Sequence, residues 1–277
     1  MAIPPTDSAS PSPAPAREQL GYVRALDGSS LYAVYHVPET SSKLPIVIAP
    51  PLFEERKSAY AALRRLAQDL AGAGHPVMRF DYRGSGESGG SGAARRWEHL
   101  AQDVMSVRKT LSALSGKRDS ALVGLRLGGT LVLQESIRAG GEAVLAFAPI
   151  VMGSTQVRLW KMRSKIRAEL TTATAGSSTT SAAAETLDFD GYDVHPKFFD
   201  DVAAIDLVKD LGRLSCPGLI AQLSHRTDPA PESTKLMETL GPRAKLECLR
   251  MEAFWDKIDD AETGALSELA LKFFQSV

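Results

Sequence analysis

The sequence predicts an α/β protein with a mostly parallel central sheet flanked by helices. Short apolar segments such as PIVIA at 45–49 alternate with segments of helical spacing such as 97–114. Buried parallel strands have this wholly apolar character, and strands separated by helices form parallel sheets with right-handed crossovers. In the segment ALVGLRLGGT at 121–130, an apolar run reaches glycine, turns within three residues and continues as an apolar helix.

The elements expected before residue 150 can be taken in chain order. Two β runs, 20–25 and 30–37, flank Asp27-Gly28 and predict a hairpin. The later strands and helices of this part are expected at 45–49, 61–71, 77–80, 97–114, 120–123, 127–138 and 143–147. This β-α-β-α-β order predicts the parallel part of the sheet.

The alternation stops after Pro149 and resumes with the strand 218–223, the helix 232–240, the strand 245–250 and the helix 262–274. We interpret residues 151–205 as a cap inserted over the strand ends, where ligand crevices of such sheets open. The cap would divide the core into 18–150 and 206–277.

Within this cap, residues 157–170 look helical and basic, and the low-complexity stretch 171–184 predicts a mobile loop. The stretch 187–207 contains the sequence DFDGYD at 188–193 and then a weakly helical segment.

Composition excludes several classes of protein. The 277 residues include 32 basic and 33 acidic side chains, so no nucleic-acid or membrane-surface footprint is expected. No apolar run reaches about 18 residues and no signal peptide is visible, so we expect no membrane span. Cys216 and Cys248 lie in or beside apolar runs and should be reduced, which predicts a cytoplasmic protein. The Pro-, Ser- and Ala-rich residues 1–17 predict a disordered tail.

The residue at the tip of the 121–130 turn is Arg126. This outline is that of a nucleophile elbow, a strained strand-to-helix turn whose tip residue projects into the site. Hydrolases carry Ser, Cys or Asp there. A guanidinium stays protonated and only donates hydrogen bonds, so Arg126 can be neither nucleophile nor base.

Four motifs carry a family resemblance. They are Asp81-Tyr82-Arg83-Gly84-Ser85-Gly86-Glu87-Ser88, Gly124-Leu125-Arg126-Leu127-Gly128, Pro50-Pro51-Leu52-Phe53-Glu54-Glu55 and Ala148-Pro149. With the order of elements, they resemble the α/β-hydrolase superfamily, and more narrowly the serine-aminopeptidase-like hydrolases found near exosortase systems. The resemblance covers about residues 20–276 and implies an α/β-hydrolase fold with a cap.

The triad that this resemblance implies is incomplete. Its order is nucleophile, acid, histidine, and Asp228-Pro229 matches the acid position. The five histidines, His36, His75, His99, His195 and His225, all precede Asp228. Where the family histidine would follow the last strand, this chain has residues 251–256, Trp255 among them. Asp228 is equally well interpreted as a cap of the following helix.

Two interpretations of Arg126 stay open. In one, it pairs with Glu54 or Glu55, which follow the strand that normally carries half of the oxyanion hole. In the other, it joins the backbone amides of Leu127 and of the loop Leu52-Phe53 to bind an anion.

Further candidates are weaker. Ser88 lies in a literal Gly-x-Ser-x-Gly at 86–90, but no strand directly precedes it, so a loop is expected. Ser154 is a candidate displaced nucleophile at the entrance of the cap. His195 and His225 are candidates to line the site, although a lone histidine is usually structural.

The sequence therefore predicts a pocket centred on Arg126 that binds an acyl, ester or carboxylate-bearing small molecule, with non-classical chemistry left open. One alternative is a catalytically dead homologue that binds a ligand or partner. The other is a hydrolase with Ser88 or Ser154 as displaced nucleophile. No zinc-type or phosphate-loop spacing is present, so no metal or cofactor is expected. The oligomeric state is open, a homodimer included.

Overall fold

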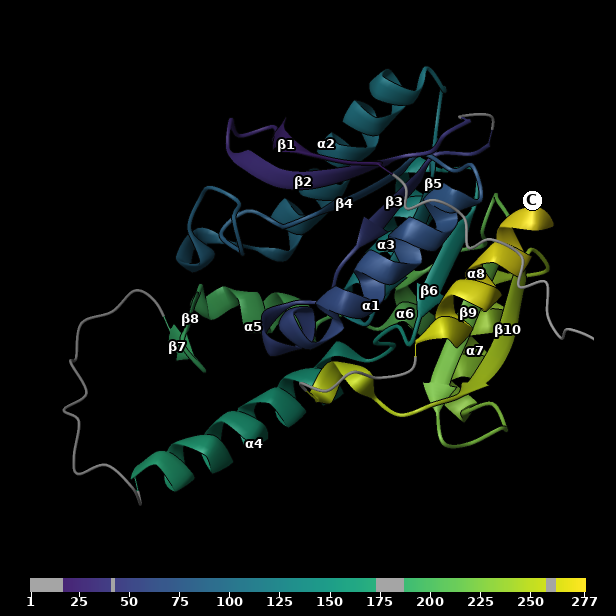
Figure 1. Ribbon diagram of the computed structural model, residues 1–277. Helices are drawn as coiled ribbons and strands as arrows, with labels where there is room; N and C mark the ends of the chain where they lie inside the picture. Colours follow the sequence, from purple (N-terminus) through teal and green to yellow (C-terminus); the bar gives the residue numbers. More distant parts are fainter. Residues whose placement is uncertain (1–16, 41–42, 173–186, 258–262) are drawn as a thin grey trace, which may run out of the picture.

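The computed structural model describes residues 17–40, 43–172, 187–257 and 263–277 (Figure 1). The predicted tail lies outside these residues, except for Arg17, which begins the first strand. The predicted mobile loop 171–184 also lies outside them, except for Thr171 and Thr172. These two residues end a helix, so the loop prediction is wrong there.

Eight strands form one sheet in the order β1-β2-β4-β3-β5-β6-β9-β10. The first two pairings, β1 with β2 and β2 with β4, are antiparallel, and the other pairings are parallel. The predicted fold class is therefore confirmed. The strands are β1 (Arg17–Arg24), β2 (Ser30–Val37), β3 (Ile46–Ala49), β4 (Val77–Phe80), β5 (Ala121–Leu125), β6 (Val144–Phe147), β9 (Gly218–Ser224) and β10 (Ala244–Arg250).

Helices cover both faces of the sheet, and an apolar core lies between the sheet and the helices on each face. One core lies between the sheet and the helices α2 (Trp97–Ser115), α3 (Leu127–Ala139) and α7 (Pro231–Leu240). The other lies between the sheet and the helices α1 (Phe53–Gly72) and α8 (Gly264–Gln275). Because strands β3, β5 and β6 are buried on both faces, their sequences are continuous apolar runs rather than alternating ones.

Helix α1 starts eight residues earlier than the predicted 61–71. Its first turns read FEERKSAY, and the residues that it buries there include the charged Glu55 as well as Phe53 and Ala59. The buried Glu55 interrupts the apolar periodicity of the first turns, so the sequence pattern did not show where α1 begins.

Five elements lie between β6 and β9. They are α4 (Gly153–Thr172), β7 (Leu187–Phe189), β8 (Tyr192–Val194), α5 (Pro196–Ala203) and α6 (Leu207–Asp210). The small β7–β8 hairpin was not predicted, although its Asp190-Gly191 turn, with both φ angles positive, is a common hairpin signature. Helix α4 extends away from the body of the protein (Figure 1).

Phe53, the first residue of α1, joins this segment to the core. Its ring makes edge-to-face contacts with four rings from α4, β7, β8 and α5. The ring centroids lie 5.3 Å away for Trp160, 5.2 Å for Phe189, 5.4 Å for Tyr192 and 6.0 Å for Phe198. Aromatic pairs in this geometry contribute beyond their buried area, so Phe53 anchors the segment over the strand ends.

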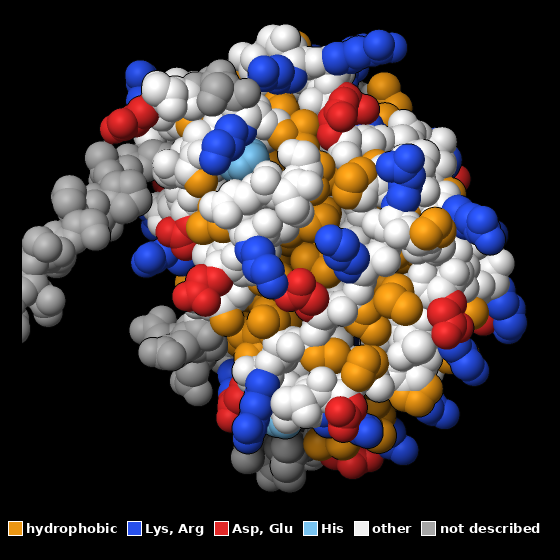
Figure 2. Space-filling model, turned by 90° about the vertical axis from the view of Figure 1, so that its right-hand side faces the viewer, with side chains coloured by type: hydrophobic (Ala, Val, Ile, Leu, Met, Phe, Trp, Pro, Cys, Tyr) orange, Lys and Arg blue, Asp and Glu red, His pale blue; other side chains and the backbone are white. Residues whose placement is uncertain are grey.

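Basic and acidic side chains are interspersed on the face formed by α7, α8, β9 and β10 (Figure 2).

No helix in the described part of the chain has the length and apolar character that a membrane span requires.

Candidate ligand-binding site

Arg126 lies in a tight turn between β5 and α3, at φ 56° and ψ −120°. A non-glycine residue at positive φ is strained by about 1–3 kcal/mol. The turn is tight because Gly124 and Gly128 have no side chain and allow other backbone segments to approach them closely. A Cβ on Gly124 would lie 2.3 Å from the carbonyl oxygen of Gly128, and one on Gly128 would lie 2.2 Å from that of Ala49. The strained turn expected from the sequence is thus present.

The guanidinium of Arg126 contacts three acceptors. Nη1 donates to the carbonyl oxygen of Ala148 at 3.3 Å, and Nη2 donates to Oε1 of Gln156 at 3.0 Å. Nε lies 3.4 Å from Oε2 of Glu55, an ionic contact without hydrogen-bond geometry. Gln156 Nε2 donates to the other carboxylate oxygen of Glu55 at 3.3 Å. Of the two expected acidic partners, the structure therefore brings Glu55 to Arg126.

Glu54 and Glu55 have different surroundings although they are neighbours. Glu55 is 5% exposed, and this burial raises the pKa of its carboxyl, while the nearby Arg126 partly opposes the rise. Glu54 instead accepts hydrogen bonds from Lys57 at 2.9 Å and from the Tyr192 hydroxyl at 3.1 Å. Glu54 therefore faces the β7–β8 hairpin, and only Glu55 faces the turn.

Trp255 covers Arg126 from the other side. It lies in a short 3-10 turn (Phe254–Asp256) after β10, and its ring centroid is 5.0 Å from the guanidinium carbon of Arg126. The next residue, Asp256, pairs with Arg163 of α4 at 2.7 Å, which ties this turn to the segment above the sheet. Residues 251–256, where the resemblance implied a histidine, thus bring an indole to Arg126.

A groove of about 630 Å³ opens beside Arg126. Trp255 lines both this groove and a smaller cavity of about 160 Å³, which Glu54 and Glu55 also line. The groove is lined by Arg126, Ala148, Pro149, Ile150, Val151, Met152, Thr155, Gln156, Leu159, Gln222, Leu223, Ser224, Arg226, Ala230, Glu232, Ser233 and Trp255. Most of its lining is apolar, and Arg126 contributes a cation whose side chain is 18% exposed.

The loop residues expected to bind through their amides are buried around the turn. Leu52 and Leu127 are each 1% exposed, and Phe53 is 5% exposed. Their side chains do not line the groove, and Phe53 lines the smaller cavity instead. Any contact of these residues with a ligand in the groove would therefore use their backbone N–H groups.

The expected acid and histidines lie outside the groove lining. Asp228 and His225 are exposed on the loop after β9. The capping expectation for Asp228 is wrong, because the N-cap of α7 is Ala230 and no side chain caps it. His195 accepts a hydrogen bond from the Lys197 amide at 3.1 Å and caps α5, a structural use.

The two candidate serines lie elsewhere. Ser88 Oγ donates to the Asp81 carbonyl at 2.6 Å and accepts from the Tyr32 amide at 2.8 Å. Ser154 is exposed on the first turn of α4 and does not line the groove. In the described residues neither hydroxyl contacts a histidine.

Two glutamines were missed by sequence reasoning. Gln156 joins Arg126 to Glu55, and Gln222 accepts from the Ala230 amide at 2.7 Å and so shapes the groove wall at α7. A glutamine has no motif that marks such a role. Among the described residues, no cluster of His, Cys, Asp and Glu could hold a metal ion.

Arg126 offers hydrogen-bond donors at the turn, and a guanidinium there cannot serve as the nucleophile that forms an acyl-enzyme. Arg126 has five N–H groups, and those not used by Ala148, Gln156 and Glu55 remain for a ligand in the groove. A guanidinium fork matches the geometry of a carboxylate.

Comparisons with known proteins agree with the fold. A family model described as serine aminopeptidase, S33 matches residues 54–211. A search of curated proteins found no match.

Three solved structures show the likeness over nearly the whole chain. Est1E of Butyrivibrio proteoclasticus with ferulic acid bound is 18% identical, with a TM-score of 0.68 over 92% of this chain and 98% of that chain. An esterase of Pyrococcus furiosus is 13% identical, with a TM-score of 0.67 over 94% and 91%. Mouse alpha/beta hydrolase domain-containing protein 10 is 17% identical, with a TM-score of 0.61 over 93% and 99%. At these identities the likeness shows the fold alone.

Proposed function

Since this chain belongs to the serine aminopeptidase (S33) family of α/β hydrolases, we propose that it binds a small acyl- or carboxylate-bearing molecule in the groove at Arg126. We further propose that it does so without the Ser-His-Asp chemistry of the superfamily. The observation that carries this proposal is the pair of residues at the turn. Arg126 occupies the tip, and Trp255 lies over it where a general base would be expected.

The two residues cannot supply nucleophilic catalysis. Acyl transfer needs a nucleophile and a base that takes its proton. A guanidinium has no accessible unprotonated form, and an indole N–H is a donor without basic character. Glu55 is the nearest group that can accept a proton, but it faces Arg126 and the smaller cavity.

The surroundings of Arg126 favour a ligand with a carboxylate or an acyl carbonyl. The walls of the groove are mostly apolar, so they suit the body of such a molecule, while a few placed polar groups fix its orientation. Est1E, which shares the fold, has been solved with ferulic acid, a carboxylic acid, bound to it. That supports a ligand of this class for the groove.

The alternatives can be compared with this proposal. A catalytically dead accessory protein would use the same groove and differ only in the events after binding. A displaced nucleophile has less support, because Ser88 is hydrogen-bonded to backbone on both sides and Ser154 does not line the groove.

Calorimetric titration with a panel of carboxylates, ferulate among them, tests the proposal. We expect saturable binding to the wild type and its loss in Arg126→Gln. Arg126→Lys should weaken binding about tenfold or more, because an ammonium cannot reproduce the bidentate fork. The matched control is Arg226→Gln, which removes an exposed cation from the same groove and should leave most of the affinity. Equal binding by the wild type and Arg126→Gln would contradict the proposal.

A further inference from the structure

Strand β1 forms one edge of the eight-stranded sheet, and β2 is its only neighbour among the described strands (Figure 1). Each of its eight residues faces one residue of β2, so no bulge interrupts it, and it contains no proline. Native proteins use bulges, prolines and charged side chains to keep edge strands from pairing with other chains. The charged residues of β1 lie toward its ends, at 17, 18 and 24, so the middle of this edge is unprotected.

Every second residue of β1 directs its backbone N–H and C=O groups away from β2. Directly after the strand, the Ala25 amide donates to the carbonyl oxygen of Ser29 at 2.8 Å, so the odd-numbered residues bond to β2. The carbonyl oxygen of Tyr32 in β2 instead accepts from the Asp81 amide at 2.9 Å, on the side away from β1. The residues of β1 whose backbone groups point to the free edge are therefore Glu18, Leu20, Tyr22 and Arg24.

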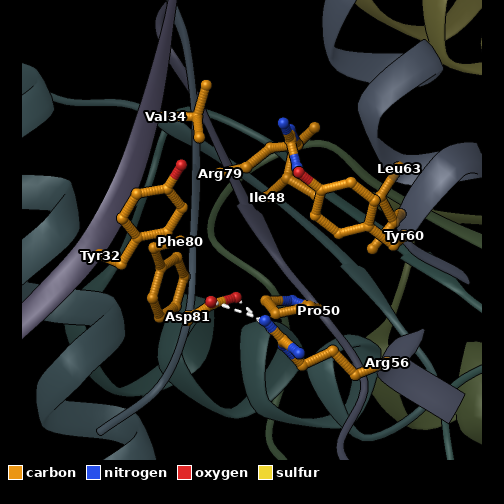
Figure 3. Close-up of a pocket in the computed structure, with 10 residues that line it drawn as sticks. All are labelled: Tyr32, Val34, Ile48, Pro50, Arg56, Tyr60, Leu63, Arg79, Phe80 and Asp81. Atoms are coloured by element: carbon orange, nitrogen blue, oxygen red, sulfur yellow. Dashed lines mark hydrogen bonds and ion pairs between the residues drawn. The ribbon is translucent and has the colours of Figure 1, made fainter. Parts of the chain in front are cut away.

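Two of these residues also expose large apolar side chains. Leu20 is 68% exposed and Tyr22 is 64% exposed. They lie on the same face of the sheet as Val34 and Tyr32, their register partners in β2, which line a small cavity together with side chains of α1 (Figure 3). Helix α1 thus covers the apolar surface over β2 but leaves its continuation over β1 open, and burial of that strip would be favourable.

From this geometry we propose that β1 pairs antiparallel with β1 of a second copy of this chain, about a two-fold axis beside Gly21. Leu20 then lies opposite Tyr22 of the second copy, and Glu18 lies opposite Arg24. The residues with outward backbone groups meet one another, so each such pair exchanges two hydrogen bonds. None of the paired residues lines the groove at Arg126, so the dimer leaves that groove open.

The charges of β1 favour a second copy over an unrelated strand. Glu18 and Arg24 lie equally far from Gly21 and have opposite signs, so the two-fold axis brings each acid to the base of the other copy. Opposite charges that face each other across two strands stabilise the pair. A register centred one residue away in either direction would lose both pairs. Glu18 is also held by Arg64 of α1 at 3.0 Å, and a carboxylate has acceptor sites for two arginines.

Cysteine cross-linking tests the register. At the axis the two chains form a pair without hydrogen bonds, whose Cα atoms lie about 4.5 Å apart, within the reach of a disulfide. A Cβ on Gly21 meets nothing within 4 Å, so Gly21→Cys should fold and form an interchain disulfide in air, seen as a dimer band on a non-reducing gel. Gln19→Cys is the matched control, because the two substituted positions would lie about 13 Å apart. A missing band for Gly21→Cys, or an equal band for Gln19→Cys, would overturn the proposal.

Sedimentation equilibrium measures the dimer without cross-linking. We expect the wild type to dimerise as its concentration rises. Leu20→Pro removes an outward N–H and keeps the bonds to β2, while Arg24→Glu places like charges opposite each other, so each should raise the dissociation constant tenfold or more. Arg17→Glu is the matched control, because it makes the same charge change on the other face of β1 and should alter the constant little. A wild type that stays monomeric, or a dimer that neither variant weakens, would contradict the proposal.

Discussion

The indole of Trp255 lies over the guanidinium of Arg126, with 5.0 Å between the ring centroid and the guanidinium carbon. The two residues follow different strands, β5 and β10, and the sheet brings them to the same end. A cation over the face of a tryptophan is stabilised by about 0.5–2 kcal/mol. The contact places an aromatic ring and a permanent cation side by side at this end of the sheet.

Active-site probes should not label this protein. We expect a fluorophosphonate to leave the wild type unmodified and p-nitrophenyl esters to be cleaved near background, because no activated hydroxyl lies at the turn. Arg126→Ser should also stay unlabelled, since no described histidine contacts that position. Gel fluorescence after labelling checks both. Labelling of the wild type that Ser88→Ala or Ser154→Ala removes would contradict the prediction.

Gly128→Val should destabilise the fold by more than about 2 kcal/mol through overpacking. A Cβ there would lie 2.2 Å from the Ala49 carbonyl oxygen and 2.6 Å from that of Pro50, and backbone cannot move aside cheaply. Urea unfolding measures the change. Gly212→Val is the control, since a Cβ on Gly212 meets nothing within 4 Å, and it should change stability by about 0.5 kcal/mol or less. Similar losses in the two variants would argue against a close crossing at Gly128.

Arg126→Met should lower the free energy of unfolding by about 3 kcal/mol at pH 8, because it strands the carboxylate of Glu55. Burial already raises the pKa of Glu55, and loss of the cation raises it further. The folded variant then holds a proton that the unfolded chain releases, so its stability recovers as the pH falls from 8 toward 5. Denaturant titrations across this range measure the recovery. The Arg126→Met, Glu55→Gln double variant lacks the carboxylate and should show no such recovery.

His36 should make the fold less stable in acid. Burial lowers its pKa to about 4 from 6.5, so between these values the unfolded state binds a proton that the folded state does not. Stability is therefore full above pH 6.5 and declines as the pH falls, by about 3 kcal/mol in total for this group. Arg79 Nε donates to Nε2 of His36 at 3.0 Å, and the side-chain oxygen of His36→Gln can still accept this hydrogen bond. The variant should therefore flatten the profile between pH 6.5 and 4. His225→Gln, at an exposed histidine, should leave it unchanged.

The sequence determined the parallel core of this protein. Strands β3, β5 and β6 are buried on both faces, so their apolar runs identified them without any knowledge of their neighbours. The turn at Arg126 could also be predicted, because a strand and a helix that meet this closely need glycines at the junction, and those glycines are visible in the sequence. The absence of a histidine after Asp228 needed only the chain order.

Only the tertiary structure decided which side chains meet at the site. Which of Glu54 and Glu55 contacts Arg126 depends on how α1 is oriented about its own axis, because adjacent residues on a helix point in different directions. Gln156 and Trp255 reach Arg126 from α4 and from the turn after β10, through contacts far apart in the chain.

Local patterns encode backbone geometry and burial, because these depend on steric and hydrophobic periodicity within a few residues. Charge pairing and desolvation depend on how separate elements pack, so no stretch of sequence contains them by itself.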